Sequence, residues 1–240
     1  TTLEPPLGSG PYKIKHVDPN RSVTLERVED YWGKDLPVAK GENNFDIIEF
    51  EYYRDAQVAI EAFTGGRFDF RTENSSKAWA TAYDVPAVKK GLIKLDQFDH
   101  NRPAGMQGFA FNTRRDIFKD PVVRHALAYA FDFEWSNKNL FYGQYSRTRS
   151  YFDNSELTAT GLPSDAELAL LEPFRGKIPD EVFTKEYNPP SSDGSGRIRS
   201  NLRTASKLLR DAGWVIKDGV RVHEATGRKL EFEILLASPL

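Results

Sequence analysis

The sequence predicts a mixed α/β fold, on three observations. Runs of β-forming residues in 10–28 flank the turn-forming triplet Asp18-Pro19-Asn20, and another such run spans 45–53. Apolar residues at helical spacing follow, most clearly in 121–131 and 202–212. The chain has 240 residues, of which 39% are hydrophobic, so it can bury a sizeable core in one or two folding units.

The first hundred residues predict strands interleaved with short helices. Asp55 can cap a helix, because its side chain can accept a hydrogen bond from the free amides of a first turn. A short alternating strand is expected at 68–70. Ser75 or Ser76 can cap the next helix, and Pro86 opens another.

The pattern becomes richer in helices from Phe109 onward. Residues 109–112 are strand-like, and Asp120-Pro121 then supplies the N-cap and first residue of a helix. Ser164 begins a capping box. The other expected elements are a helix at 134–142, a helix that ends at Gly213, a hairpin that turns at Asp218-Gly219, and a strand at 229–236; segment 184–196 is the loosest part of the chain.

Charge and composition exclude several classes of protein. The formal net charge is −2 and the sequence pI is about 6.1, which argues against a general nucleic-acid binder. No apolar run approaches the ~18–20 residues that span a bilayer, so the chain is not expected to be membrane-spanning. Cysteine is absent, which excludes disulfides and thiolate chemistry without selecting a compartment.

Both ends of the sequence look cut. The chain begins with Thr1 rather than an initiator methionine, and no targeting signal follows. It ends soon after the strand expected at 229–236, for which the sequence offers no evident partner. We therefore expect a piece of a longer protein.

A search for catalytic groups finds none. The four histidines are far apart in the sequence, and His125 lies inside an expected helix, where a structural role is favoured over metal binding. The glycine triplets at 8–10 and 194–196 are favoured as turns over dinucleotide loops. We predict no catalytic residue, no metal site and no cofactor. The aromatic residues, 12% of the chain, fit either core packing or the wall of a pocket.

Four motifs, in this order, resemble family 5 of the bacterial extracellular solute-binding proteins, the peptide-binding components of ABC importers. Together they cover nearly the whole chain, although each motif alone would not be specific for the family. They are Gly8-Ser9-Gly10-Pro11-Tyr12 with Asp30-Tyr31-Trp32-Gly33; Ala62-Phe63-Thr64-Gly65-Gly66-Arg67-Phe68-Asp69-Phe70; Phe111-Asn112-Thr113 with Phe118-Lys119-Asp120-Pro121-Val122-Val123-Arg124; and Ala212-Gly213-Trp214 with Asp218-Gly219-Val220-Arg221.

Further segments are similar to one branch of that family, the Yej-type oligopeptide and microcin C importers. These segments are Phe133-Glu134-Trp135, Asn139-Leu140-Phe141-Tyr142-Gly143-Gln144-Tyr145, Tyr151-Phe152 and Gly161-Leu162-Pro163-Ser164.

The resemblance implies part of a two-lobed, class II-like periplasmic binding protein, with mixed sheets, flanking helices and truncation at both ends. Residues 1–112 would be a segment of the first lobe, ending in an inter-lobe crossing at 109–112. Residues 113–240 would be the first half of the second lobe.

The resemblance also implies a function without bond chemistry. Such a protein captures oligopeptides in the cleft between its lobes and delivers them to an ABC permease in the inner membrane, and it works in the periplasm. By position, Glu73, Asn74, Gly108 and Phe109 would contact the ligand. For Glu73 and Asn74, a solvated turn is an equally good interpretation.

Two other functions stay open. The same fold could bind another solute, such as an oligosaccharide or a metal complex, with Trp32, Trp79 or Trp135 stacked on a sugar. A hydrolase is disfavoured, because the sequence has no nucleophile motif and no paired acids.

Overall fold

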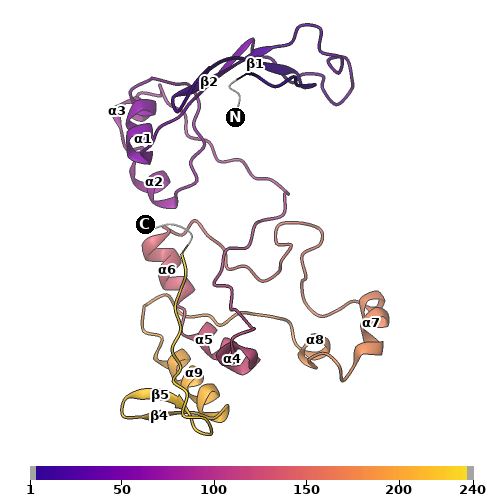
Figure 1. Ribbon diagram of the computed structural model, residues 1–240, viewed down its shortest axis with the longest axis vertical. Helices are drawn as coiled ribbons and strands as arrows, with labels where there is room; N and C mark the ends of the chain where they lie inside the picture. Colours follow the sequence, from indigo (N-terminus) through magenta and orange to yellow (C-terminus); the bar gives the residue numbers. More distant parts are fainter. Residues whose placement is uncertain (1–3, 237–240) are drawn as a thin grey trace. The chain divides into compact units, whose positions relative to one another are not determined.

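The computed structural model describes residues 4–236, and these residues form the mixed α/β structure that the sequence predicts. The chain divides by its internal contacts into two compact units, with the division between Leu95 and Asp96 (Figure 1). The predicted lobe boundary at residue 112 remains a prediction, because the units are defined by contacts and not by their place in a longer protein.

The first unit contains a three-stranded antiparallel sheet in the order β1-β2-β3. The strands are β1 (Tyr12–Asp18), β2 (Ser22–Arg27) and β3 (Ile47–Glu51). The predicted turn joins β1 to β2: Asn20 adopts a φ of 63°, a value that asparagine tolerates better than most residues. The Tyr12 hydroxyl donates to the Phe45 carbonyl at 2.7 Å and fastens β1 to the segment before β3.

Three short helices complete the first unit: α1 (Ala56–Thr64), α2 (Ser76–Thr81) and α3 (Pro86–Lys89). The predicted caps are confirmed. Asp55 accepts hydrogen bonds from the amides of Gln57 and Val58, and Ser75 accepts one from Ala78. α1 buries Ala59 and Ile60, the inward side of its apolar stripe.

The core of the second unit lies where α5 (Pro121–Tyr129) packs on α9 (Arg199–Asp211). The predicted cap is present, since Asp120 accepts from the Val122 amide at 2.8 Å. The core is completed by α4 (Asp116–Lys119) and by the first strand of the hairpin β4 (Trp214–Lys217) and β5 (Val220–His223). Its buried residues are Ile117, Phe118, Val123, Ala126, Leu209 and Trp214.

The remaining helices of the second unit carry no buried residue. They are α6 (Phe133–Leu140), α7 (Asp165–Leu171) and α8 (Glu181–Thr184), with a short 3-10 turn at Glu172–Phe174 after α7 (Figure 1). The predicted capping box at the start of α7 is confirmed: the Glu167 amide donates to Ser164 Oγ, and the Ser164 amide donates to Glu167 Oε2.

Two predicted strands are wrong at the level of hydrogen-bonded structure. No strand forms at 68–70 or 229–236 in the described chain. Residues 109–112, expected as a strand or an extended crossing, form no strand ladder, and the crossing between lobes stays a prediction. In the last segment, Lys229 makes a single bridge to Val222 and the Leu230 amide donates to the Arg221 carbonyl. The alternating pattern was correct, but a strand needs a neighbour that completes its ladder.

The prediction that 184–196 is the loosest segment is wrong for its last residues, 192–196, although residues 185–193 form no helix or strand. Gly194 is buried, and Ser192 is bonded to the start of α6: its amide donates to Glu134 Oε2 at 3.0 Å, and its hydroxyl lies 2.5 Å from Asp132 Oδ1. The glycines at 194 and 196 form turns as predicted, with φ values of 70° and 78°. Turn-forming composition alone does not reveal that a loop packs on a helix.

Candidate functional site

Glu73 lies in the first unit, between the segment 68–70 and α2, in a compact hydrogen-bonded cluster. The Arg71 guanidinium donates to Glu73 Oε2 at 3.2 Å, and the Tyr83 hydroxyl donates to the same oxygen at 2.9 Å. The Ser75 amide donates to the other oxygen, Glu73 Oε1, at 2.9 Å. Only 4% of the Glu73 side chain is exposed, so both oxygens already have protein partners.

The charges of this cluster stabilise one another. Burial alone would raise the pKa of the Glu73 carboxyl, but the hydrogen bonds from Ser75, Tyr83 and Arg71 outweigh burial and hold this pKa below its usual value. Burial raises the pKa of the Tyr83 hydroxyl, and its bond to the Glu73 carboxylate raises that pKa further. The cluster therefore contains an ionised carboxylate that fixes the turn before α2.

Asn74 is the exposed member of this turn. Ser75 on one side caps α2, and Glu73 on the other is held by Arg71. Asn74 itself is exposed and makes no hydrogen bond to another described residue. The Glu73 cluster therefore presents the Asn74 amide, a donor and an acceptor, to solvent from a fixed backbone.

Gly108 and Phe109 lie in the second unit, on an exposed segment with no helix or strand. The backbone N–H and C=O groups of residues 105–111 make no hydrogen bond to any other residue that the structure describes. The Phe109 side chain is 63% exposed. This segment therefore offers unused main-chain donors and acceptors together with an apolar ring.

Phe109 belongs to a small group of aromatic rings around Arg147. Its ring lies edge-on to the ring of Phe131, with the two centroids 6.1 Å apart. The Arg147 guanidinium lies over the Phe131 ring at 5.1 Å and over the Phe133 ring at 5.2 Å. Contacts of this kind are worth about 0.5–2 kcal/mol each. We call Phe109, Phe131, Phe133 and Arg147 the aromatic–arginine cluster.

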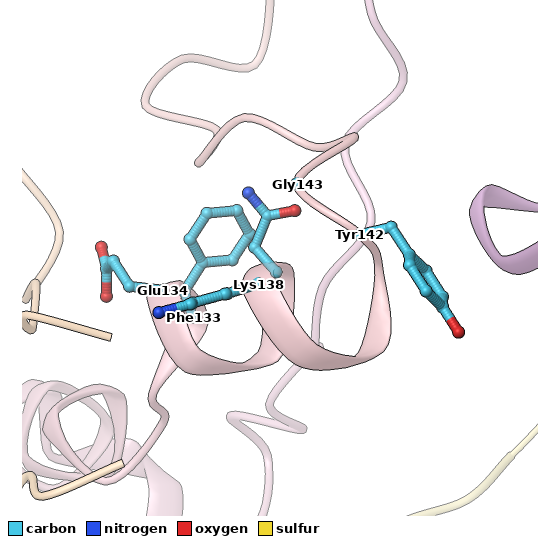
Figure 2. Close-up of a pocket in the computed structure, with 6 residues that line it drawn as sticks. Phe133, Glu134, Lys138, Tyr142 and Gly143 are labelled. Carbon is cyan, nitrogen blue, oxygen red and sulfur yellow. The ribbon is translucent and has the colours of Figure 1, made fainter. Parts of the chain in front are cut away.

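An open hollow of about 510 Å³ lies on α6, next to this cluster (Figure 2). Phe133 belongs to both, since its ring also lines the hollow. Figure 2 shows Phe133, Glu134 and Lys138 on the same helix, while Tyr142 points away from them. The full lining is Phe133, Glu134, Asn137, Lys138, Tyr142 and Gly143.

The four residues that the sequence nominated fall into two pairs. Glu73 and Asn74 are in the first unit, and Gly108 and Phe109 are in the second. Sequence reasoning missed Arg71 and Tyr83 around Glu73, and Phe131, Phe133 and Arg147 around Phe109. The spacing Phe131-x-Phe133 was a usable signal, but nothing in the sequence indicates that Arg147 lies over both rings.

The described residues show no other chemical centre. Among residues 4–236, no three His, Cys, Asp or Glu side chains are grouped so that they could hold a metal ion. No helix in that part of the chain is long and apolar enough to cross a membrane. The structure therefore offers binding groups: main-chain amides, aromatic faces, a guanidinium and an exposed amide.

Comparison with known protein families decides the class. The model of the bacterial extracellular solute-binding proteins, family 5, middle region, matches residues 1–239. The chain belongs to this family. The resemblance drawn from the four sequence motifs is therefore confirmed, and the Yej-type branch is confirmed by relatives that carry that name.

Two of these relatives are YejA proteins. The chain is 47% identical over 239 residues to "Probable peptide-binding protein YejA" of Agrobacterium fabrum, matching 99% of this chain and 39% of that protein. It is also 47% identical over 232 residues to YejA of Escherichia coli, matching 97% of this chain and 38% of that protein. The family 5 chain thus spans well under half the length of these relatives.

Solved structures establish the fold. Brucella suis NikA, in complex with Fe(III)-EDTA, matches with a TM-score of 0.58 and 21% identity, over 93% of this chain and 36% of NikA. The oligopeptide-binding protein AppA of Bacillus subtilis, in complex with a nonapeptide, matches with a TM-score of 0.52 and 20% identity, over 92% of this chain and 35% of AppA. The family 5 chain has part of the two-lobed periplasmic binding protein fold that these structures share.

Proposed function

We propose that the full-length protein is the substrate-binding component of an ABC importer. It captures oligopeptides in the cleft between its lobes and delivers them to a permease in the inner membrane. It works in the periplasm, makes and breaks no bond, and needs no cofactor. The observation that carries the proposal is the 47% identity, across 239 residues, to a relative named as a peptide-binding protein.

The exposed segment around Phe109 supports a peptide as the ligand. An extended peptide binds by adding a strand, and this requires a backbone whose N–H and C=O groups are not already paired. The backbone of residues 105–111 meets this requirement within the described chain. Gly108 would let the peptide main chain approach closely, and Phe109 would contact a peptide side chain.

The Glu73 turn supports a contact through Asn74. Because the carboxylate of Glu73 is occupied by Arg71, Tyr83 and Ser75, we assign it the role of holding the turn. The Asn74 amide would then contact the peptide main chain. Peptide termini and side chains would be recognised by charged groups and water, which tolerates many sequences.

A metal complex or a sugar is kept as the alternative ligand, each on one observation. NikA, which shares this fold, was solved with a metal complex, Fe(III)-EDTA. A sugar ligand would need an exposed aromatic face, and Trp32 is 71% exposed. Hydrolysis is the least supported function, because no serine or threonine hydroxyl among the described residues is hydrogen-bonded to a histidine.

The test is a thermal-shift screen of the full-length protein against three probes: a pool of synthetic peptides, Fe(III)-EDTA and mannohexaose. We expect the peptide pool alone to raise the melting temperature. Chromatography of the peptides after incubation checks for cleavage, and we expect them to be recovered intact. A shift with only Fe(III)-EDTA or mannohexaose, or the loss of intact peptides, would contradict the proposal.

A further inference from the structure

Arg147 is a cation that has no ion-pair partner among the described residues. Its side chain is half-buried, and its guanidinium lies over the rings of Phe131 and Phe133. Within the described part of the chain it makes no ion pair and no hydrogen bond. A guanidinium over aromatic rings keeps its N–H groups at the edge of its plane, so all five donors remain available.

The acids nearest in sequence to these rings make no ion pair and no hydrogen bond with Arg147. Asp132, between the two phenylalanines, uses Oδ1 alone: this oxygen accepts from the Trp135 amide at 3.1 Å and lies within hydrogen-bond distance of the Ser192 hydroxyl. Its other oxygen, Oδ2, is buried and has no hydrogen-bond partner among the described residues. Glu134 accepts from the Ser192 amide. Both carboxylates fasten the 192–196 loop to α6, and among the described residues neither forms an ion pair with the cation over the rings.

We propose that Arg147 binds a carboxylate of the peptide ligand. This rests on the proposed function and adds a chemical preference to it. A carboxylate suits the guanidinium because its two oxygens can accept two parallel N–H groups. The Phe131 and Phe133 rings hold the guanidinium plane in position, and the exposed Phe109 ring contacts the neighbouring part of the peptide.

The spacing of the cluster limits where the carboxylate lies along the peptide. The Phe109 ring is 6.1 Å from the Phe131 ring, which is 5.1 Å from the Arg147 guanidinium. An extended peptide advances about 3.3 Å per residue. A carboxylate on Arg147 therefore lies within about three residues of the peptide residue that contacts Phe109.

The experiment is calorimetry on the full-length protein with three matched pentapeptides. The first is uncharged in its side chains and has a free carboxyl terminus, the second is its carboxyl-terminal amide, and the third is the amide with one glutamate. We expect one or both carboxylate-bearing peptides to bind about tenfold to a hundredfold more tightly than the neutral amide. The free acid and the glutamate amide distinguish a terminal carboxylate from a side-chain one.

Arg147→Gln should abolish this preference, so that all three peptides bind as the neutral amide does. Arg147→Lys should retain part of it, because the charge remains while the planar donor fork is lost. The matched control is Arg149→Gln, which removes an equal charge from an arginine already bonded to Asn188, and the preference should survive. Circular dichroism checks the fold of each variant.

The outcomes separate this inference from the proposed function. A wild-type protein that binds peptides without favouring a carboxylate, or an Arg147→Gln protein that keeps the preference, would overturn the role of Arg147 and leave peptide binding intact. A wild-type protein that binds none of the three peptides would overturn both.

Discussion

Gly196 lies directly against the indole ring of Trp135. A Cβ added at Gly196 would come within 3.0 Å of Trp135 Cδ1 and 3.1 Å of Nε1. The backbone at Gly196 also has a φ of +78°, so two separate reasons favour glycine at this position. This contact, with the Ser192 bonds, holds the loop on α6.

Gly196→Ala should therefore destabilise the protein more than Gly219→Ala. Both glycines have a φ of +78°, so both variants incur a similar backbone cost of about 1 kcal/mol. Only at Gly196 does the new methyl group meet ring atoms, since the space around Gly219 is open. We expect an extra loss of about 1 kcal/mol in the free energy of unfolding, measured by denaturant titration. Equal losses in the two variants would mean that the indole moves aside without cost.

Glu73→Gln should destabilise the protein at neutral pH by about 2 kcal/mol, because it removes the charge and replaces one of two accepting oxygens by an NH2 donor that faces other donors. The folded-state pKa of Glu73 is lowered, so its ionisation stabilises the fold above the unfolded pKa of about 4.3. That contribution is lost as the pH falls through the lower folded-state pKa.

The difference in unfolding free energy between wild type and Glu73→Gln should therefore shrink as the pH is lowered from 7 towards 3. Glu49→Gln is the control: this carboxylate is exposed on β3 and makes no hydrogen bond to another described residue. Its substitution should have little effect at any pH. If the difference in unfolding free energy between wild type and Glu73→Gln stays constant with pH, the charge of Glu73 does not stabilise the fold.

Leu127→Asp should unfold the second unit. Leu127 packs against the buried core of α5 and α9, where an unpaired carboxylate costs about 3 kcal/mol or more. His125→Asp places the same residue on the exposed side of the same helix and should retain the native circular dichroism. If the two variants melt at the same temperature as wild type, the Leu127 side of α5 is not core.

Phe109→Ala should weaken peptide binding by the full-length protein about tenfold, because it removes an aromatic contact. Phe98→Ala is the matched control, since Phe98 is also exposed, at 79%, on the irregular segment that begins the second unit. Calorimetry with one peptide and the three proteins measures the effect. A loss in Phe98→Ala equal to that in Phe109→Ala would contradict a specific role for Phe109.

The elements that the sequence predicted correctly are those whose signals are local. Asp120 caps α5 through the amide of Val122, two residues away, and Ser164 and Glu167 cap α7 across three residues. Such bonds form wherever those residues occur in that order. The strand expected at 229–236 failed because a strand depends on a partner elsewhere in the chain.

The candidate site shows the same contrast. Family resemblance nominated Glu73 and Phe109, but it gave no information on their neighbours. Tyr83 reaches Glu73 from ten residues further along, and Arg147 reaches Phe131 from sixteen residues away. Such contacts depend on how helices and loops are folded back, which composition and periodicity do not specify.

The hydrogen bond from Arg149 to Asn188, at 3.1 Å, joins the two ends of the long connecting segment 149–188. Between these ends, α7, the 3-10 turn and α8 bury no residue. Because closing a flexible loop costs only about 0.6 kcal/mol more for each doubling of its length, residues added or removed between 160 and 187 would hardly affect the core. A tag or fluorescent reporter inserted between 160 and 187 should therefore leave the melting temperature of the second unit close to that of the wild type, because no buried residue is displaced.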